Sequence, residues 1–359
     1  MVESWERGIC YSRTALHVSG RVTRSIIVFL VCDLPAARKA AQLAGPTSHF
    51  YCTACHCWHR STCGRTDIQT EDWALKDKNE VRRYAELWKN TGTSVERNKL
   101  FASHGVQWST LWRLSYWDPS RQIVVNTMHC LLEGLAHAHF CRMPSVRICK
   151  LGHRTREVMQ CIADVIKTTD TPSFLRSVPY NFGETKAGTV KADEWRTLTT
   201  VYLPIALVSL WGEGSAHRNS DIAVSRRAIL DHTMDLVSAI HIVCLRSMTQ
   251  DHADAYRTYM INWIRDLQVI LPHARHRTNG HMALHVWDYL QLFGPVWSWW
   301  CFPYERLIGQ LQRLPSNHIF GSIQISLSMI DFLRYAGMQD SKNQLSSGPT
   351  SRLQSLNIG

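Results

Sequence analysis

The sequence is short of acidic residues. Its 29 Asp and Glu residues face 40 Lys and Arg residues, so the formal net charge is +11 and the pI is near 9.2. Before Asp33 the only acidic residues are Glu3 and Glu6. This balance favours a polyanionic partner, with nucleic acid first, although charge alone fits many basic surfaces.

The sequence also lacks a long apolar run and an export signal. The longest mostly apolar stretch, residues 201–211, contains a proline and is well short of the roughly 20 residues that span a bilayer. Residues 1–8 are polar and charged, and the first apolar run covers only 26–32. We therefore expect no membrane partner. Twelve cysteines in such a chain point to a reducing compartment, with thiols or metal ligands rather than disulfides.

No internal repeat of fixed period is present. The 359 residues, 45% of them hydrophobic, suffice for one large or two modest domains and exclude wholesale disorder. Fourteen tryptophans are many for this length. We expect most of them in the core, and stacking on nucleic-acid bases is the alternative.

Residues 26–32 are continuously apolar and rich in β-branched side chains, which predicts a strand covered on both faces. Pro35 within an alanine-rich run then marks a helix start, and Gly45 and Pro46 mark its end. Asp33 would lie where the strand turns into the helix. That position suits either an active-site acid or an ordinary N-cap.

The middle of the chain is mostly helical in pattern, and only residues 122–125 suggest a short strand. Apolar residues recur at helical spacing in the segments 80–89, 155–168, 195–211, 225–248 and 254–271. From residue 340 onward the chain has little to bury, which predicts a disordered tail.

Two residue pairs have spacings typical of metal ligands. Cys52 and Cys55 form a C-x-x-C pair, which also fits a redox pair or two unrelated core thiols. His281 and His285 are four residues apart, so on a helix both imidazoles share one face. The metalloprotease signature is excluded because Met282 stands where its general-base Glu is required.

A local zinc loop is the alternative to a site that joins these distant pairs. Its spacing, C-x2-C-x3-H-x3-C, is plausible for a small zinc-binding knuckle. The ligands of this alternative are Cys52, Cys55, His59 and Cys63, with His56 and Cys57 as further candidates.

A helix is predicted to open at Pro303, after an aromatic run. Its expected buried stripe consists of Leu307, Ile308, Leu311 and Leu314. Glu305 lies in the first turn of this helix, where the helix N-terminus favours a carboxylate. A metal-binding role for Glu305 is the functional alternative.

Five stretches of the chain resemble the transposases of CACTA (En/Spm-type) DNA transposons. They are YSRTAL at 11–16, VCDLPAARK at 31–39, KADEWRTL at 191–198, HMALH at 281–285 and FPYERLIGQLQ at 302–312. The resemblance runs in order from about residue 5 to about residue 335. It implies an α/β fold, in which an RNase H-like core is interrupted by a large, mainly α-helical insertion.

The resemblance assigns roles to six residues. Asp33 matches the second acid and Glu305 the glutamate of a DDE triad, which binds two Mg2+ or Mn2+ ions for DNA strand cleavage and transfer. The pairs Cys52/Cys55 and His281/His285 match a structural zinc site. Such a site would pin both ends of the insertion together and offset the entropic cost of closing that loop. DNA would be the partner and the nucleus the location.

The implied organisation has four parts. Residues 1–55 form a partial core, 56–270 the helical insertion, 271–339 the completing segment with the His pair and Glu305, and 340–359 the tail.

The chain departs from the family pattern at two points. The first catalytic aspartate of the family lies upstream of the segment where this chain begins. The family's Asp-x-x-His motif corresponds here to residues 126–129, in which Asn126 replaces the aspartate and His129 is the histidine. We therefore expect a catalytically impaired transposase region that acts as a homo-oligomer or with a missing N-terminal segment. A domesticated zinc-containing DNA-binding or protein-interaction module is the alternative.

Overall fold

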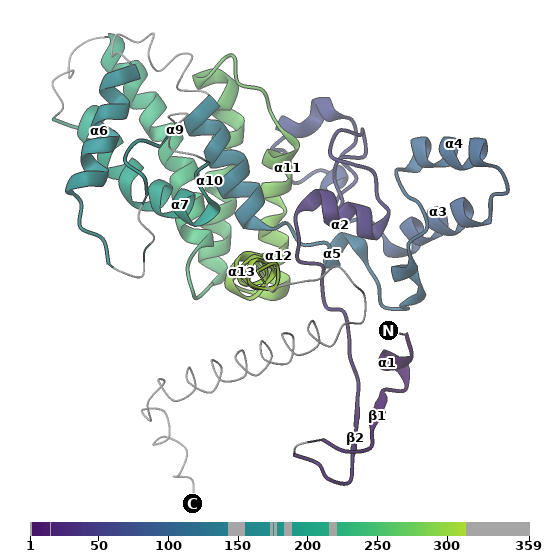
Figure 1. The fold of residues 1–359 in the computed structure, drawn as a ribbon. Coiled ribbons are helices and arrows are strands. Elements are labelled where there is room, and N and C mark those ends of the chain that lie inside the picture. The colour runs from purple at the N-terminus through teal and green to yellow at the C-terminus, as the bar shows by residue number, and fades with distance from the viewer. Residues whose placement is uncertain are drawn as a thin grey trace, which may run out of the picture. The chain divides into compact units, whose positions relative to one another are not determined.

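The computed structural model describes residues 2–14, 16–142, 155–172, 175, 178–182, 189–214 and 221–313. Helices dominate these residues (Figure 1). The α-helices are α1 (Val2–Glu6), α2 (Leu34–Ala41), α3 (Lys78–Asn90), α4 (Ser94–His104), α5 (Pro119–Gln122), α6 (Thr155–Thr168), α7 (Ala192–Thr197), α8 (Leu203–Trp211), α9 (Asp221–Val243), α10 (Gln250–Ile270), α11 (Thr278–Leu284), α12 (Val286–Phe293) and α13 (Phe302–Leu311). Shorter 3-10 and π-helical segments are η1 (Arg60–Gly64), η2 (Glu71–Trp73), η3 (Thr110–Arg113), η4 (Met128–Ala136), η5 (Ala138–Arg142), η8 (Leu198–Tyr202) and η9 (Val296–Ser298).

The chain divides into two compact units, residues 1–301 and 302–359. The described part contains one sheet, in which β1 (Ile9–Tyr11) and β2 (Arg21–Thr23) pair antiparallel with Ile9 opposite Thr23. The predicted helix-rich middle of the chain is therefore confirmed. The RNase H-like core and the four predicted segment boundaries stay predictions, and the tail 340–359 lies outside the described residues.

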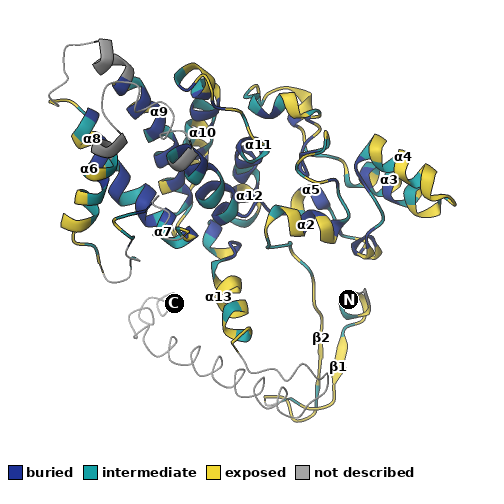
Figure 2. Cartoon of the chain, turned by 45° about the horizontal axis from the view of Figure 1, so that its top comes forward, coloured by how far each residue is buried: buried dark blue, intermediate teal, exposed yellow. Residues whose placement is uncertain are grey.

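The two longest helices, α9 and α10, pack side by side and form the centre of a helical layer (Figure 1). One face of α10 is buried at helical spacing, at Tyr256, Met260, Trp263, Ile264 and Leu267. This buried stripe corresponds to the apolar residues whose helical spacing predicted a helix at 254–271. Figure 2 shows that much of α9 and α10 is coloured as buried.

The helices α3 and α4 form a hairpin on the first unit (Figures 1 and 2). Asp77 caps α3 by accepting a hydrogen bond from the backbone N of Asn79, and Val81 and Ala85 make its buried face. No residue of α4 is buried. Gly105 ends α4 in the left-handed conformation, with φ of 68°, which favours glycine.

The prediction of a buried strand at 26–32 is wrong. Within this run only Leu30 pairs, in one parallel bridge with Ile123. The backbone N of Leu30 donates a hydrogen bond to the carbonyl oxygen of Gln122. Ile26 and Val28 are 50% and 48% exposed. An apolar run becomes a buried strand only when strands flank it and layers cover both faces, and in the described part of the chain this run has a single bridge. The predicted strand at 122–125 is likewise reduced to that bridge.

Two buried histidines lie between η5, α9 and α10. The Nε2 atom of His139 lies 3.0 Å from Oγ1 of Thr233, and Nε2 of His232 lies 2.9 Å from the carbonyl of Trp263. Burial lowers the pKa of His139 to about 3, with a further lowering from His232, and burial also lowers the pKa of His232. Both imidazoles are therefore neutral in the folded protein near neutral pH.

We expect the protein to lose stability as the pH falls below about 6.5. The unfolded chain binds protons at these histidines from about pH 6.5 downward, whereas folded His139 does not until the pH nears its lowered pKa. His139 alone should lower the free energy of unfolding by on the order of 2 kcal/mol between pH 6.5 and 5, as measured by urea unfolding, and His232 should act in the same direction. His139→Gln should flatten this slope, and the exposed His241→Gln should not. An unchanged slope in His139→Gln would contradict this explanation.

Candidate metal centre

The first half of the site is a tight turn that carries Cys52 and Cys55 and is held from α2. The buried guanidinium of Arg38 donates hydrogen bonds to the carbonyl oxygens of Ala44 and Tyr51, at 3.0 Å for Ala44. These bonds fix the backbone just before Cys52. Within the turn, the backbone N atoms of Ala54 and Cys55 approach Sγ of Cys52 at 3.4 and 3.3 Å.

The second half of the site comes from α11 and the turn that follows it. His281 lies on α11 and His285 at its C-terminal cap, and both are at most 2% exposed. Because they are four residues apart, their imidazoles share one face of the helix. That face is directed at the cysteine turn.

The four side chains converge on one point. Sγ of Cys55 lies 3.4 Å from Sγ of Cys52 and 3.3 Å from Nε2 of His281. Nε2 of His285 lies 3.4 Å from Sγ of Cys52 and 3.3 Å from Nε2 of His281. All four atoms are within 4.8 Å of one another, and all four residues are buried. The structure thus brings together the two pairs that the sequence analysis singled out.

These spacings match a tetrahedral ion. Bonds of about 2.3 Å to sulfur and 2.0–2.1 Å to nitrogen place the ligand atoms of a tetrahedral zinc site roughly 3.3–3.8 Å apart. Four of the six ligand-atom separations are 3.3–3.4 Å, at the lower end of that range, and the other two are within 4.8 Å. Two thiol sulfurs and two imidazole nitrogens are also the donor set that zinc prefers. The cluster could therefore hold a metal ion such as zinc.

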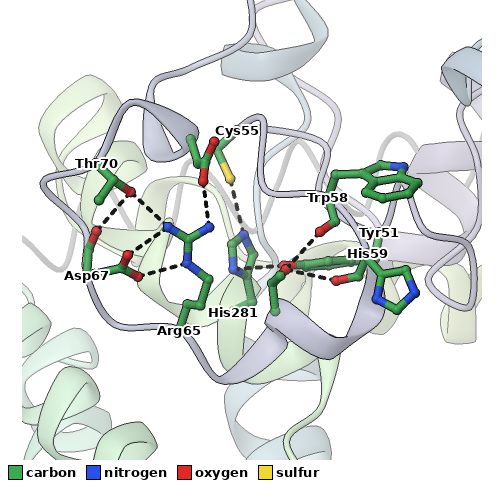
Figure 3. Close-up of polar contacts among 10 residues, drawn as sticks. Tyr51, Cys55, Trp58, His59, Arg65, Asp67, Thr70 and His281 are labelled. Carbon is green, nitrogen blue, oxygen red and sulfur yellow. Dashed lines mark hydrogen bonds and ion pairs between the residues drawn. The ribbon is translucent and has the colours of Figure 1, made fainter.

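The outer ring nitrogens of both histidines have partners. Nδ1 of His285 lies 2.8 Å from Oδ2 of Asp288, and Nδ1 of His281 lies 3.5 Å from the hydroxyl of Tyr51. Figure 3 shows Cys55 and Tyr51 approaching the His281 imidazole, with the Tyr51 hydroxyl also 2.8 Å from Thr62 Oγ1. These contacts orient Nε2 of each ring toward the cysteines.

A loop between η1 and α3 covers the site. Trp73 stacks on His281 with ring centroids 4.5 Å apart and an interplanar angle of 23°. Arg65 holds this loop by ion pairs to Asp67 and Asp72, at 2.7 and 2.6 Å (Figure 3). The indole excludes water from the imidazole face, which strengthens polar interactions within the cluster.

The electrostatic environment of the site favours a thiolate at Cys52. Burial raises the pKa of Cys52, but the hydrogen bond from Cys55 and the two imidazoles outweigh it, so the net pKa lies well below its ordinary value. Burial and Cys52 raise the pKa of Cys55. Burial would lower the pKa of His285, but Cys52 and Asp288 together raise it to about 10. These shifts favour a Cys52 thiolate beside a protonated His285 when no metal is bound, and metal binding must displace the protons that the ligands hold.

We expect Asp288→Asn to weaken zinc binding about 10- to 100-fold, because the amide orients His285 without the charge of the carboxylate. Competition with a chromogenic zinc chelator measures this affinity. Asp266→Asn, on α10 and paired with Arg265 at 2.8 Å, removes one acidic charge elsewhere and is the matched control. Equal zinc affinity in the two variants would rule out this role for Asp288.

The local knuckle alternative is not assembled. His59 is partly exposed and caps η1, with its Nδ1 accepting from the backbone N of Ser61. Cys63 is buried and interacts with Tyr51. Cys57 is hydrogen-bonded to Cys55 but falls outside the four-atom cluster. Among the described residues, the long-range set is the single group of three or more candidate ligands that could share an ion.

The two acids that the resemblance assigned to catalysis lie in different units. Asp33 is exposed, and its Oδ1 accepts a hydrogen bond from Ala36 N at 2.7 Å, so it is the N-cap of α2. Glu305 is exposed in the first turn of α13. The predicted buried stripe is wrong for the described part of that helix, since Leu307 and Ile308 are 39% and 51% exposed and no described residue of α13 is buried. Leu314 lies outside the described residues.

The Asn126-Thr-Met-His129 segment has a structural explanation. Asn126 is buried, and its Oδ1 accepts from the backbone N of Met128 at the start of η4. His129 pairs with Glu133 at 2.6 Å. Neither side chain belongs to the metal cluster.

Sequence reasoning missed the residues that support the ligands. The spacing of His285 and Asp288, i and i+3 around a helix start, was a readable signal for the outer hydrogen bond. Trp73 and Tyr51 gave no such signal, because their approach to His281 depends on how the loops close.

The described helices include none with both the length and the apolar character of a membrane span. Comparison with protein-family models gives no match to this chain, and no curated protein matches it either.

Proposed function

We propose that this protein is a transposase-derived DNA-binding protein, similar to the catalytic region of CACTA transposases, with a structural zinc ion at its Cys2His2 centre. The observation that carries the proposal is the meeting of Cys55 with His281 across 226 positions of sequence. The resemblance implied this pairing of a C-x-x-C turn with a distant histidine pair. On this proposal the zinc joins the two ends of a helical insertion in a partial RNase H-like core, and the protein works in the nucleus.

A structural rather than a catalytic zinc fits the arrangement. Four protein ligands complete a tetrahedron and leave no open position for water or substrate. The ligands are at most 2% exposed, so a reacting group has no access. The ion would supply folding energy by closing the long segment between the two ligand pairs.

Positive charge supports DNA as the partner. Residues 7–32 contain four arginines and no acidic residue, and residues 78–104, the α3–α4 hairpin, contain six Lys or Arg against three Glu. Much of this charge is solvent-exposed. Such a surface would bind phosphates with little dependence on base sequence.

DNA binding is tested by its dependence on salt. If about six phosphates are neutralised, affinity for a duplex should fall roughly a thousandfold between 50 and 200 mM salt, as measured by fluorescence anisotropy. A chain that does not bind duplex DNA at low salt, or that binds independently of salt, would overturn the proposal.

We further propose that this chain by itself does not cut DNA. Two-metal chemistry needs several carboxylates around one ion pair. Asp33 is engaged in capping α2, and among the described residues no cluster other than the Cys2His2 group could share an ion. Robust nicking of labelled DNA with Mg2+ or Mn2+, abolished by Glu305→Gln, would show that the chain is an active enzyme.

A protein-interaction role is the second candidate, and the β1–β2 hairpin favours it. Ile9, Tyr11 and Val22 on this hairpin are 43%, 47% and 57% exposed. A short sheet with open edges and exposed apolar side chains can pair with a strand of another chain, including a second copy of this one. Analytical ultracentrifugation of the protein and its Val22→Lys variant would detect self-association through this hairpin.

A further inference from the structure

A cavity of about 210 Å³ lies between the cysteine turn and the α3–α4 hairpin. Its lining includes Phe50, Thr53 and Lys76 on one side and Glu80, Tyr84 and His104 from the hairpin on the other. Cys52 also lines the cavity, so the cavity adjoins the metal centre. The other three candidate ligands, Cys55, His281 and His285, do not line it. Nothing in the proposed zinc role uses this cavity.

Aromatic rings form part of the walls. Tyr84 and His104 stack with centroids 3.8 Å apart and an interplanar angle of 12°. Phe50 packs close to Gly105, where an added Cβ would come within 2.6 Å of Cβ of Phe50. Glycine at this position therefore preserves the shape of the cavity. Aromatic side chains in the lining suit a ligand with a flat ring.

The polar groups of the cavity include both donors and an acceptor. Nζ of Lys76 donates to the carbonyl of Cys52 at 2.7 Å, which leaves two of its three protons for another partner. The hydroxyl of Thr53 is buried without a hydrogen-bond partner, in a residue that is 4% exposed. Oε1 of Glu80 accepts from the Tyr84 hydroxyl at 3.2 Å and has further lone pairs. A buried hydroxyl without a partner is costly unless a ligand satisfies it.

Arg83 lies beside Tyr84, a residue of the cavity wall. The guanidinium of Arg83 lies 5.0 Å from the centroid of the Tyr84 ring and 3.3 Å from its hydroxyl. Arg83 is exposed, and the described residues give it no ion pair with a carboxylate. It is therefore placed to contact a phosphate attached to a ligand in the cavity.

We propose that this cavity binds a single unstacked nucleobase, with the adjoining phosphate on Arg83. Bases are flat, and most carry carbonyl acceptors for Lys76 and Thr53 as well as an amino or imino donor for Glu80. The inference rests on the proposed DNA-binding function and deepens it, because it predicts a preference for single-stranded or distorted DNA over an intact duplex.

The test uses a single-stranded oligonucleotide that contains one 2-aminopurine, a base whose fluorescence reports its stacking. Binding to the full chain should change this fluorescence. Tyr84→Leu should weaken single-strand binding at least fivefold, since contact of a base with an aromatic ring contributes about 1–3 kcal/mol, or roughly 5- to 150-fold. Lys76→Met should also weaken it, because the variant lacks the hydrogen-bond donor for the base. Thr53→Val, which changes a hydroxyl to a methyl, should weaken it in the same direction.

The controls separate this inference from the proposed function. Lys39→Gln removes one positive charge from the exposed side of α2, outside the cavity and outside both basic segments, and should leave the fluorescence change intact. Zinc content is measured for Lys76→Met, because Lys76 binds the carbonyl of a metal ligand. All cavity variants should bind duplex DNA like the unmodified protein.

Three outcomes would overturn one proposal or both. Duplex binding with no 2-aminopurine response, or with single-strand affinity unchanged in Tyr84→Leu and Thr53→Val, would overturn the base site alone. Absence of binding to both kinds of DNA would overturn the DNA-binding function and the base site together. Displacement of the oligonucleotide from the cavity by an aromatic peptide at equal affinity would show that the cavity takes a protein side chain instead.

Discussion

Cys55→Ser is expected to abolish stoichiometric zinc binding and to lower the free energy of unfolding by about 5 kcal/mol or more. The substitution removes one of four converging ligand atoms and leaves the Cys52 thiolate and two imidazoles buried around an incomplete site. Structural zinc contributes on the order of 10 kcal/mol in small zinc domains, while whole domains are stable by only about 5–15 kcal/mol. Zinc content by mass spectrometry and urea unfolding measure the two effects.

Cys63→Ser is the matched control, because Cys63 is also buried and belongs only to the local alternative site. We expect it to retain one zinc ion and to lose less than about 1.5 kcal/mol. His59→Gln and His281→Gln form a second pair: we expect His59→Gln to retain the zinc ion and His281→Gln to lose it. If Cys63→Ser or His59→Gln lost the metal while His281→Gln kept it, the ion would lie in the local knuckle, and the long-range clamp would be wrong.

Metal affinity should also fall as the pH falls, since the ligands must lose their protons to bind. His285, with its pKa raised to about 10, and Cys55, with its pKa raised by burial, both hold protons that the ion has to displace. Proton release on zinc addition, measured by calorimetry in buffers of different ionisation enthalpy, gives an independent count of these displaced protons.

Arg38→Ala is expected to destabilise the protein by about 3 kcal/mol and to loosen the metal centre. Arg38 is 1% exposed, and its loss leaves the buried carbonyl oxygens of Ala44 and Tyr51 without donors. Each unsatisfied buried group costs about 1–3 kcal/mol, and the vacated space adds a cavity term. Because Tyr51 directly precedes Cys52, we also expect weaker zinc binding. Urea unfolding and chelator competition test both expectations.

Lys39→Ala is the control for Arg38→Ala. Lys39 is the next residue of α2 and is exposed, so its loss should change the free energy of unfolding by less than about 0.5 kcal/mol. Comparable effects of the two substitutions would show that Arg38 acts through the helical propensity of α2 rather than through its two carbonyl contacts.

The sequence predicted those parts of the fold that depend on local periodicity. The helix at 155–168 has the bounds of α6, and α10 differs from the predicted 254–271 mainly by starting earlier, at Gln250. The N-cap role of Asp33 followed from proline and alanine just after it. Capping and amphipathic spacing involve neighbours within a few residues, so a linear reading captures them.

The predictions that failed involve partners distant in sequence. An apolar run at 26–32 has the composition of a buried strand, but strand formation depends on flanking strands and covering layers that the run itself does not encode. The stripe on α13 failed for the same reason, because an apolar face is buried only where another surface covers it.

The residue types and spacings of the metal centre were determined by the sequence alone: a C-x-x-C turn, and a histidine pair whose four-residue spacing puts both rings on one helix face. Only the tertiary structure decided that these two pairs share one point rather than forming separate sites, and that Asp288, Tyr51 and Trp73 support them. The physical reason is the sequence separation over which each kind of contact acts. Spacing along a helix fixes which side chains share a face, whereas the meeting of Cys55 with His281 depends on the packing of every element between them.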